Sequence, residues 1–171
     1  NSDRLRHSTS YGVNMIRKPF AAFGRVLYAN YYENGYTVDT VTYADSQTVL
    51  LFTEGSITVR DKVTGSVAYE CVPGYIKYGD YRNGLYVSTA NAPSVSWCYD
   101  PKVNQGYVPP MELVALKTGE AIELPQGTRL FLCSGTLVIN GVDHVAPRQI
   151  SVKSASVTAA ATTDVYGLNF K

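Results

Sequence analysis

The chain has 171 residues, 15 basic against 14 acidic side chains, and a formal net charge of +1. This length predicts one domain large enough to bury a core, and the balanced charge gives no sign of a surface for nucleic acid or anionic membranes. Only 17% of the residues are charged, whereas 14 are tyrosine. Tyrosine is favoured in strands and also suits protein interfaces or carbohydrate contacts, so both interpretations stay open.

Residues 1–23 differ from the rest of the chain. Four basic side chains stand against one acidic one, and apolar residues are interleaved with polar ones without a long regular period. Such apolar content is unusual for a disordered tail. We therefore expect an N-terminal arm that packs across the outside of the domain or reaches a neighbouring subunit, with a floppy terminus as the alternative.

From residue 24 onward the sequence predicts β-strands joined by turns, and no helix of useful length. Alternating or short apolar runs indicate the strands, and Asn34-Gly35 and Asn140-Gly141 are typical of hairpin turns. The predicted strands are residues 26–32, 36–43, 48–52, 56–61, 66–72, 111–116, 121–124, 128–133, 136–140, 142–145, 148–155 and 164–170.

Two segments are less regular. Residues 74–110 contain four prolines and the only tryptophan, with short strands expected at 85–88 and 94–99. We interpret this segment as an insertion, and long insertions in compact folds are often functional. The Ser/Ala/Thr-rich residues 154–163 are predicted to be a turn or a weak strand edge.

One stretch, GEAIELPQGTRLF, carries a spaced pattern of Gly119, Pro125 and Gly127, followed by Leu130 and Ser134. Alternating apolar residues precede a proline–glycine turn, and a new apolar strand follows it. The spacing resembles the second motif of the cupin family, in which the place of Leu130 is a histidine that binds a metal ion.

The stretch from Gly35 to Gly55 has the spacing of the first cupin motif, with Val41, Tyr43 and Thr48 at places that are His, His and Glu in the family. Apart from its two glycines, this motif is lost. The resemblance implies a barrel that keeps the scaffold, and the substitutions exclude the family's metal, because divalent cations need His or carboxylate donors.

An internal repeat supports this interpretation. TVLLFTEGSITVRD, residues 48–61, aligns with TRLFLCSGTLVING, residues 128–141, and Gly55 coincides with Gly135. Each copy predicts a strand, a glycine turn and a second strand. A cupin barrel has two such halves, although another sandwich or jelly roll would also repeat apolar strands around glycines.

The predicted fold is therefore all-β: a cupin-like double-stranded β-helix or jelly-roll barrel over residues 24–171, preceded by the arm. We expect no cofactor and no metal. The four positions that replace the family's ligands should lie in the barrel interior: Val41, Tyr43, Thr48 and Leu130.

Catalytic groups are scarce. The chain has two histidines, His7 and His144. His144 follows Asp143 directly, and neighbours on a strand point to opposite faces, which is poor geometry for a dyad. We therefore favour a surface histidine. GxSxG and phosphate-loop motifs are absent from the sequence.

The cysteines and the chain start suggest where the protein resides. Cys71, Cys98 and Cys133 form no Cys-x-x-Cys pair, and Cys71 and Cys133 have the pattern of small core residues in a reducing compartment. The first residues contain no apolar core of a signal peptide, and no apolar run reaches the length of a transmembrane helix.

Low charge, many tyrosines and an apolar basic arm predict a non-enzymatic, homo-oligomeric structural protein. By analogy of composition it would be a phage or virus particle component, such as a capsid decoration or tail protein, located in the virion or in the cytoplasm of the producing cell. Its partners would be other protein subunits, with no nucleic acid and no membrane. The candidate interface residues are Arg17, Phe20, Phe23, Tyr81, Tyr86 and Trp97.

The alternative is a metal-free cupin that binds or isomerises a sugar or another small molecule. Metal-free cupin isomerases resemble one another in placing a histidine base inside the barrel. This sequence has no histidine at the matched positions. A ligand-binding cupin needs no such base, but it needs an open barrel mouth.

Overall fold

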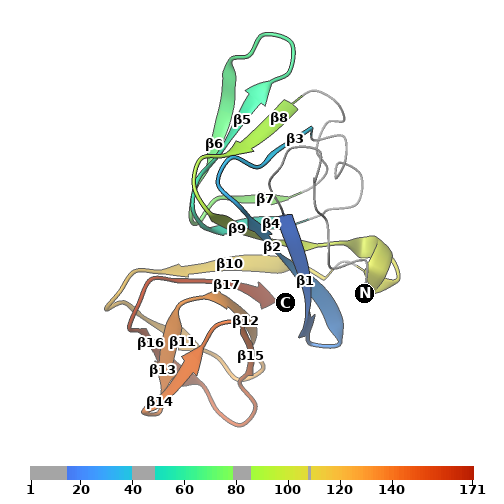
Figure 1. Ribbon diagram of the computed structural model, residues 1–171. Helices are drawn as coiled ribbons and strands as arrows, with labels where there is room; N and C mark the ends of the chain where they lie inside the picture. The colour runs from blue at the N-terminus through green and yellow to red at the C-terminus, as the bar shows by residue number, and fades with distance from the viewer. Residues whose placement is uncertain (1–14, 40–48, 79–85, 108) are drawn as a thin grey trace. The chain divides into compact units, whose positions relative to one another are not determined.

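The computed structural model describes residues 15–39, 49–78, 86–107 and 109–171 (Figure 1). The regular structure in these ranges is β-strand apart from one short 3-10 helix, η4 (Pro101–Asn104). The all-β prediction is confirmed. Within the same ranges, no helix is long and apolar enough to cross a membrane.

The chain divides into two compact units. The first comprises Asn1–Phe20 and Arg25–Val108, and the second comprises Ala21–Gly24 and Pro109–Lys171. This differs from the prediction of one barrel over residues 24–171. The two copies of the internal repeat fall into different units, so each copy contributes its hairpin to a separate core.

The first unit contains two sheets. Its described strands are β1 (Met15–Ala22, whose last two residues count with the second unit), β2 (Arg25–Tyr32), β3 (Thr37–Asp39), β4 (Val49–Glu54), β5 (Ile57–Asp61), β6 (Val67–Cys71), β7 (Ile76–Tyr78), β8 (Tyr86–Ala90) and β9 (Ser94–Tyr99). The strand orders are β1-β2-β9-β4-β7 and β3-β8-β5-β6. Strands distant in sequence pair antiparallel, such as β2 with β9 and β3 with β8, as in jelly rolls.

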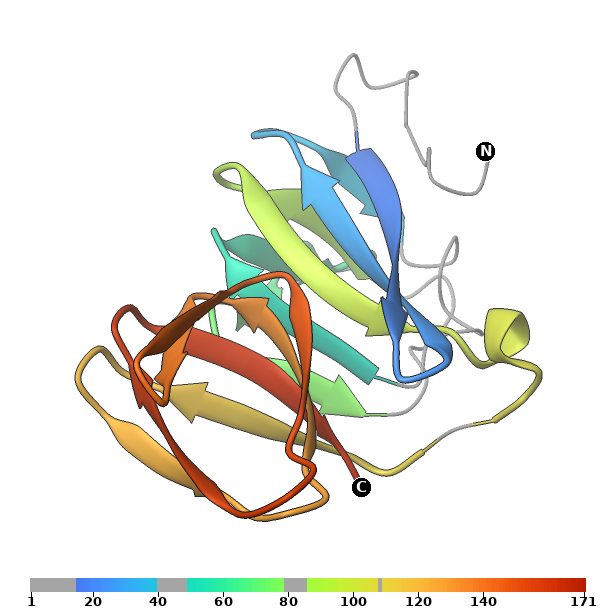
Figure 2. The same cartoon turned by 90° about the horizontal axis from the view of Figure 1, so that it is seen from below.

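The second unit also contains two sheets. Its strands are β10 (Met111–Leu116), β11 (Ala121–Leu124), β12 (Arg129–Ser134), β13 (Thr136–Ile139), β14 (Val142–Val145), β15 (Arg148–Ser151), β16 (Val157–Ala161) and β17 (Val165–Phe170). The orders are β10-β17-β12-β15 and β11-β16-β13-β14. In Figure 2 these gold to red strands curl around one interior, which is filled by buried Leu130, Leu132, Leu137, Ala159 and Val165.

Several turns confirm the sequence interpretation. Thr128 N–H donates to the Pro125 carbonyl at 3.1 Å, which closes the turn of the second motif. Asn140 and Gly141 have φ of 51° and 74°, as the hairpin between β13 and β14 requires. At Asn34-Gly35 the prediction of a hairpin is wrong, because β2 and β3 lie in different sheets.

Three segments are more regular than the sequence predicts. Residues 15–22, assigned to the arm, form β1 beside β2 in the five-stranded sheet. Residues 74–110, interpreted as an insertion, contain the two expected strands as β8 and β9, each of which lies between two other strands, and also β7, which the sequence does not predict. Within residues 154–163, β16 pairs with both β11 and β13. Small or polar side chains weaken the alternation in these segments, and packing between strands decides their conformation.

The two glycines of the repeat occupy equivalent, crowded turns. Gly55 has φ of +84° and Gly135 has φ of +93°. A Cβ on Gly55 would lie 2.5 Å from the Pro93 carbonyl oxygen, and one on Gly135 would lie 2.2 Å from the Asp164 carbonyl oxygen. In each unit the hairpin turn therefore needs both a left-handed backbone and the absence of a side chain.

Acid should destabilise the second unit partly through Asp164. Its Oδ1 accepts hydrogen bonds from the N–H and the hydroxyl of Thr118, at 2.9 and 3.0 Å, and these bonds lower the pKa of the carboxyl. The stabilisation is therefore complete above the ordinary carboxyl pKa of about 3.9 and is lost as pH falls through the lowered folded value. Asp164→Asn should flatten the pH dependence of urea unfolding between about pH 2 and pH 5, and identical slopes would contradict the argument.

Candidate ligand cavity in the first unit

The sequence places four residues at degenerate metal positions. Val41, Tyr43 and Thr48 lie outside the described residues. Leu130 is fully buried in the core of the second unit, where it packs with other aliphatic side chains. The position that holds a metal-binding histidine in the cupin family is therefore an apolar packing position in this chain.

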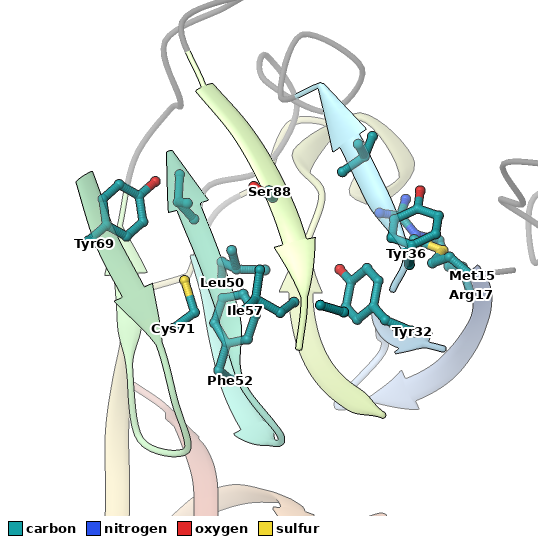
Figure 3. Close-up of a pocket in the computed structure, with 13 residues that line it drawn as sticks. Met15, Arg17, Tyr32, Tyr36, Leu50, Phe52, Ile57, Tyr69, Cys71 and Ser88 are labelled. Carbon is teal, nitrogen blue, oxygen red and sulfur yellow. The ribbon is translucent and has the colours of Figure 1, made fainter. Parts of the chain in front are cut away.

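The described part of the first unit contains a cavity of about 60 Å³ between its two sheets (Figure 3). Successive residues of a strand point to opposite faces, and the cavity is lined by alternate residues of each segment. The lining pairs are Met15 and Arg17, Tyr36 and Val38, Leu50 and Phe52, Ile57 and Val59, Tyr69 and Cys71, and Ser88 and Ala90, together with Tyr32. Several of these residues are only half-buried.

A cation lies at one end of this cavity. Arg17 is 4% exposed, its Nε donates to Asn30 Oδ1 at 2.8 Å, and its Nη2 lies 3.5 Å from Cys98 Sγ. The guanidinium carbon lies 4.9 Å from the centre of the Tyr28 ring, which adds a cation–π contact. These contacts hold the guanidinium in one orientation at the cavity wall.

Tyr32 continues this polar end. Its hydroxyl shares a hydrogen bond with Ser96 Oγ at 2.9 Å, and Ser96 accepts from Asn30 at 3.2 Å. Burial raises the pKa of Tyr32 far above its usual value, while the Ser96 bond and the charge of Arg17 lower it by smaller amounts. The field of Arg17 therefore reaches the phenol at the cavity wall.

Aromatic rings surround the other end. Figure 3 shows Tyr69 and Cys71 across the cavity from Tyr32, Tyr36 and Arg17. The Tyr69 ring stacks on Tyr75 with 5.8 Å between centroids, and burial raises the pKa of its hydroxyl.

Burial likewise raises the pKa of the Cys71 thiol to about 12. Near neutral pH the thiol and the phenols of this end are therefore uncharged.

The described lining does not fit the metal ion of the cupin family. It offers hydroxyls, a thiol and a guanidinium, but neither an imidazole nor a carboxylate, and divalent cations need several such donors. No group of three or more His, Cys, Asp and Glu side chains suited to an ion occurs in the ranges that the structure describes.

The candidate interface residues lie in different environments. Trp97 is 1% exposed, and its ring lies 5.1 Å from that of Phe20. Arg17 is enclosed as well, on the cavity face of the five-stranded sheet, whereas Trp97 lies on the opposite face. Contact of these two residues with another subunit stays a prediction.

Four further interface candidates remain, of which Phe20 is half-buried on β1. Phe23 belongs to the second unit, where its ring lies 5.3 Å from Phe170. Tyr86 is half-buried against Tyr69, and Tyr81 lies outside the described residues. The contact of these residues with another subunit therefore stays a prediction.

His144 is half-buried on β14, opposite Leu137. Burial and the charge of Arg148 lower its pKa, and Asp143 raises it by a smaller amount. His7 lies outside the described residues.

Sequence reasoning missed Tyr32, Tyr36 and Tyr69 as members of one site. The signal lies in the alternation within each strand, as in Val67, Tyr69 and Cys71, but which inward faces meet depends on pairing between distant strands. The sequence predicts strand or surface positions for the 14 tyrosines, whereas Tyr32, Tyr36 and Tyr69 line the cavity.

No family model and no curated protein matches the chain. Solved structures do. HutD from Pseudomonas fluorescens SBW25 is 12% identical, with a TM-score of 0.56 over 97% of this chain and 91% of that one. YhhW from Escherichia coli is 14% identical, with a TM-score of 0.52 over 99% and 94%. The bacterial pirin YhhW in complex with nickel(II) is 15% identical, with a TM-score of 0.50 over 99% and 96%. At such identities the likeness shows the fold alone: this chain has a cupin-like, all-β fold.

Proposed function

We propose that the first unit binds a small organic molecule in its cavity, without a metal ion. The observation that carries this proposal is the lining itself: alternate residues of both sheets surround about 60 Å³, with a cation at one end and mainly apolar walls. Binding sites of this kind combine apolar walls with a few polar groups that set orientation.

The contrast with the second unit supports the proposal. There the corresponding interior holds tightly packed Leu, Val, Ile and Ala side chains, as expected for a core that serves stability. A non-enzymatic role is favoured because the described cavity lining includes no carboxylate or imidazole that could act as a general base. This interpretation selects the ligand-binding alternative of the sequence analysis.

Blocking the cavity should abolish binding. Ser88 lines the cavity on β8, so Ser88→Trp places a large ring in it. We expect titration with acetone, isopropanol, butanamide and butanoate to shift backbone amide resonances around the cavity in the unmodified protein, and not in Ser88→Trp.

Val87→Trp is the matched control, because Val87 precedes Ser88 on the same strand and faces the other side of the sheet. It should keep the response to the probes. If none of the four probes shifts the cavity resonances of the unmodified protein, or if Ser88→Trp binds as well as Val87→Trp, the proposal is wrong.

The role as a phage or virus particle component, its protein partners and its location in a virion or cytoplasm stay predictions from the sequence. Light scattering with and without residues 1–23 tests them, since a monomer that is indifferent to those residues would contradict an assembly role.

A further inference from the structure

We propose that the ligand of this cavity is an uncharged molecule of a few heavy atoms, such as a short ketone or secondary alcohol. Its oxygen hydrogen-bonds to the Ser88 hydroxyl, and its carbon chain lies against Ala90, Ile57 and Phe52. The inference rests on the proposed function and narrows it to one chemical class. Four observations support it: the register of the four-stranded sheet, the hydroxyl of Ser88, the charge state of the lining and the size of the cavity.

Strand pairing arranges the cavity face of the sheet β3-β8-β5-β6 into two rows. Residues that are paired across antiparallel strands lie side by side on one face. Ala90 pairs with Ile57, and Ile57 pairs with Cys71. These three side chains are 2–5% exposed, and a buried thiol behaves as a small apolar group. The first row is therefore a buried, apolar surface.

The second row carries hydroxyl groups. Ser88 pairs with Val38 on one side and with Val59 on the other, and Val59 pairs with Tyr69 (Figure 3). Ser88, Val38 and Tyr69 are half-buried. The two rows are two residues apart along each strand, or about 7 Å. A ligand with one oxygen can therefore place that oxygen at the second row and its carbons against the first.

The Ser88 hydroxyl is the group that suits this contact. In the ranges that the structure describes, it makes no hydrogen bond of its own, whereas the Tyr32 hydroxyl and the Arg17 guanidinium are already bonded. Ser88 is on an inner strand of its sheet, while Tyr69 is on the edge strand and stacks on Tyr75. Because a serine hydroxyl both donates and accepts, it can bind the oxygen of a ketone or of an alcohol.

The lining favours an uncharged ligand. Burial raises the pKa of Tyr32, Tyr69 and Cys71, so these groups are neutral near pH 7. Arg17 is the one charged side chain of the described lining, and it takes no part in the proposed contact. A charged group at Ser88 would exchange its hydration for one neutral hydroxyl, which costs far more for an ion than for a carbonyl or hydroxyl oxygen.

The volume sets the size of the ligand. The cavity of about 60 Å³ exceeds the 10–15 Å³ or so that one water needs, and it is smaller than the roughly 150 Å³ that holds benzene. A molecule of about three or four carbons therefore fits better than an aromatic ring. Acetone is a suitable probe, and 2-methylpropene has nearly the same shape with a methylene group in place of the oxygen.

The test measures how Ser88→Ala changes the Kd of these two probes, by titration of backbone amide resonances of the full chain near pH 7. We expect the Kd of acetone to rise about five-fold, as the loss of one hydrogen bond implies, and the Kd of 2-methylpropene to stay nearly unchanged. Equal changes for the two probes, or no change for acetone, would overturn the inference and leave the proposed function standing. Failure of all four probes of the proposed function to bind would overturn both.

Thr89→Val is the matched control. Thr89 follows Ser88 on β8 and faces the other side of the sheet, where its hydroxyl lies 3.2 Å from that of Thr37. The change removes one hydroxyl at nearly constant volume, and the Kd of acetone should stay at its value in the unmodified protein. A rise as large as that in Ser88→Ala would overturn the inference, because the effect would then not come from the cavity face.

Butanamide and butanoate test the charge of the ligand. The two molecules have nearly the same shape, and only butanoate is ionised near pH 7. We expect butanamide to bind the unmodified protein with the lower Kd, since it loses less hydration on entering the cavity. A lower Kd for butanoate would overturn the inference, although binding of either probe at the cavity would still support the proposed function.

Discussion

Gly135→Ala should lower the free energy of unfolding of the second unit by about 3 kcal/mol. A left-handed backbone at a residue with a Cβ costs about 1–2 kcal/mol, and forcing atoms into a filled space adds about 1–3 kcal/mol. Both effects operate here: φ is +93°, and the new Cβ would lie 2.2 Å from the Asp164 carbonyl oxygen and 2.9 Å from Val165 Cγ2. Because β12 must continue into β13 at this point, the turn cannot relax without moving β17.

Gly119→Ala is the matched control in the same unit. Gly119 has φ of +90°, but a Cβ there would have nothing within 4 Å, so only the backbone cost of about 1–2 kcal/mol applies. Hydrogen exchange measured on peptides of β12 and β17 separates the two variants. An equal loss of protection in both would show that the close approach at Gly135 costs nothing.

Gly135 also shows which features of the fold the sequence could predict. Gly55 and Gly135 stand at equal places in the internal repeat, and both prove to be crowded turns with positive φ. The repeat and the turn at Pro125 are both local patterns. The sequence could predict them because local backbone geometry restricts the residue type. The all-β, cupin-like class followed from such local signals.

Pairing between distant segments could not be predicted in the same way. β9 lies between β2 and β4, and nothing in the sequence of residues 94–99 indicates these neighbours. β16 contains three consecutive alanines, whose weak alternation hides a strand that is paired on both sides. The division into two units could not be predicted for the same reason, because it depends on which hairpin packs against which core.

The candidate site depends both on local sequence patterns and on pairing between distant strands. The sequence identifies Arg17 as a cation, but its context predicts a place in an outer arm. Only the pairing of β1 with the sheet turns it toward Leu50 and Phe52, and only the meeting of two sheets brings Tyr69 to the opposite end. A charge visible in the sequence thus becomes part of the cavity wall through contacts that the sequence does not reveal.

Leu130→Ala should destabilise the second unit by about 3 kcal/mol, within the range for leucines truncated in packed cores. Leu130 is fully buried on β12, among Leu132, Leu137 and Ala159. Leu130→Met, which nearly conserves volume, should cost less than about 1.5 kcal/mol. Urea unfolding with hydrogen exchange on β12 peptides measures both. A neutral Leu130→Ala would mean that this interior is not packed.

The repeat supplies a second comparison, because Leu50 stands at the place in the first unit that Leu130 holds in the second. Leu50 borders the cavity, so part of its surface lacks packing partners, and truncation removes fewer contacts. Leu50→Ala should therefore cost about 2 kcal/mol, less than Leu130→Ala, and should enlarge the space open to a ligand. If Leu50→Ala proved the more costly, the cavity would be closed in solution and the first unit would be packed like the second.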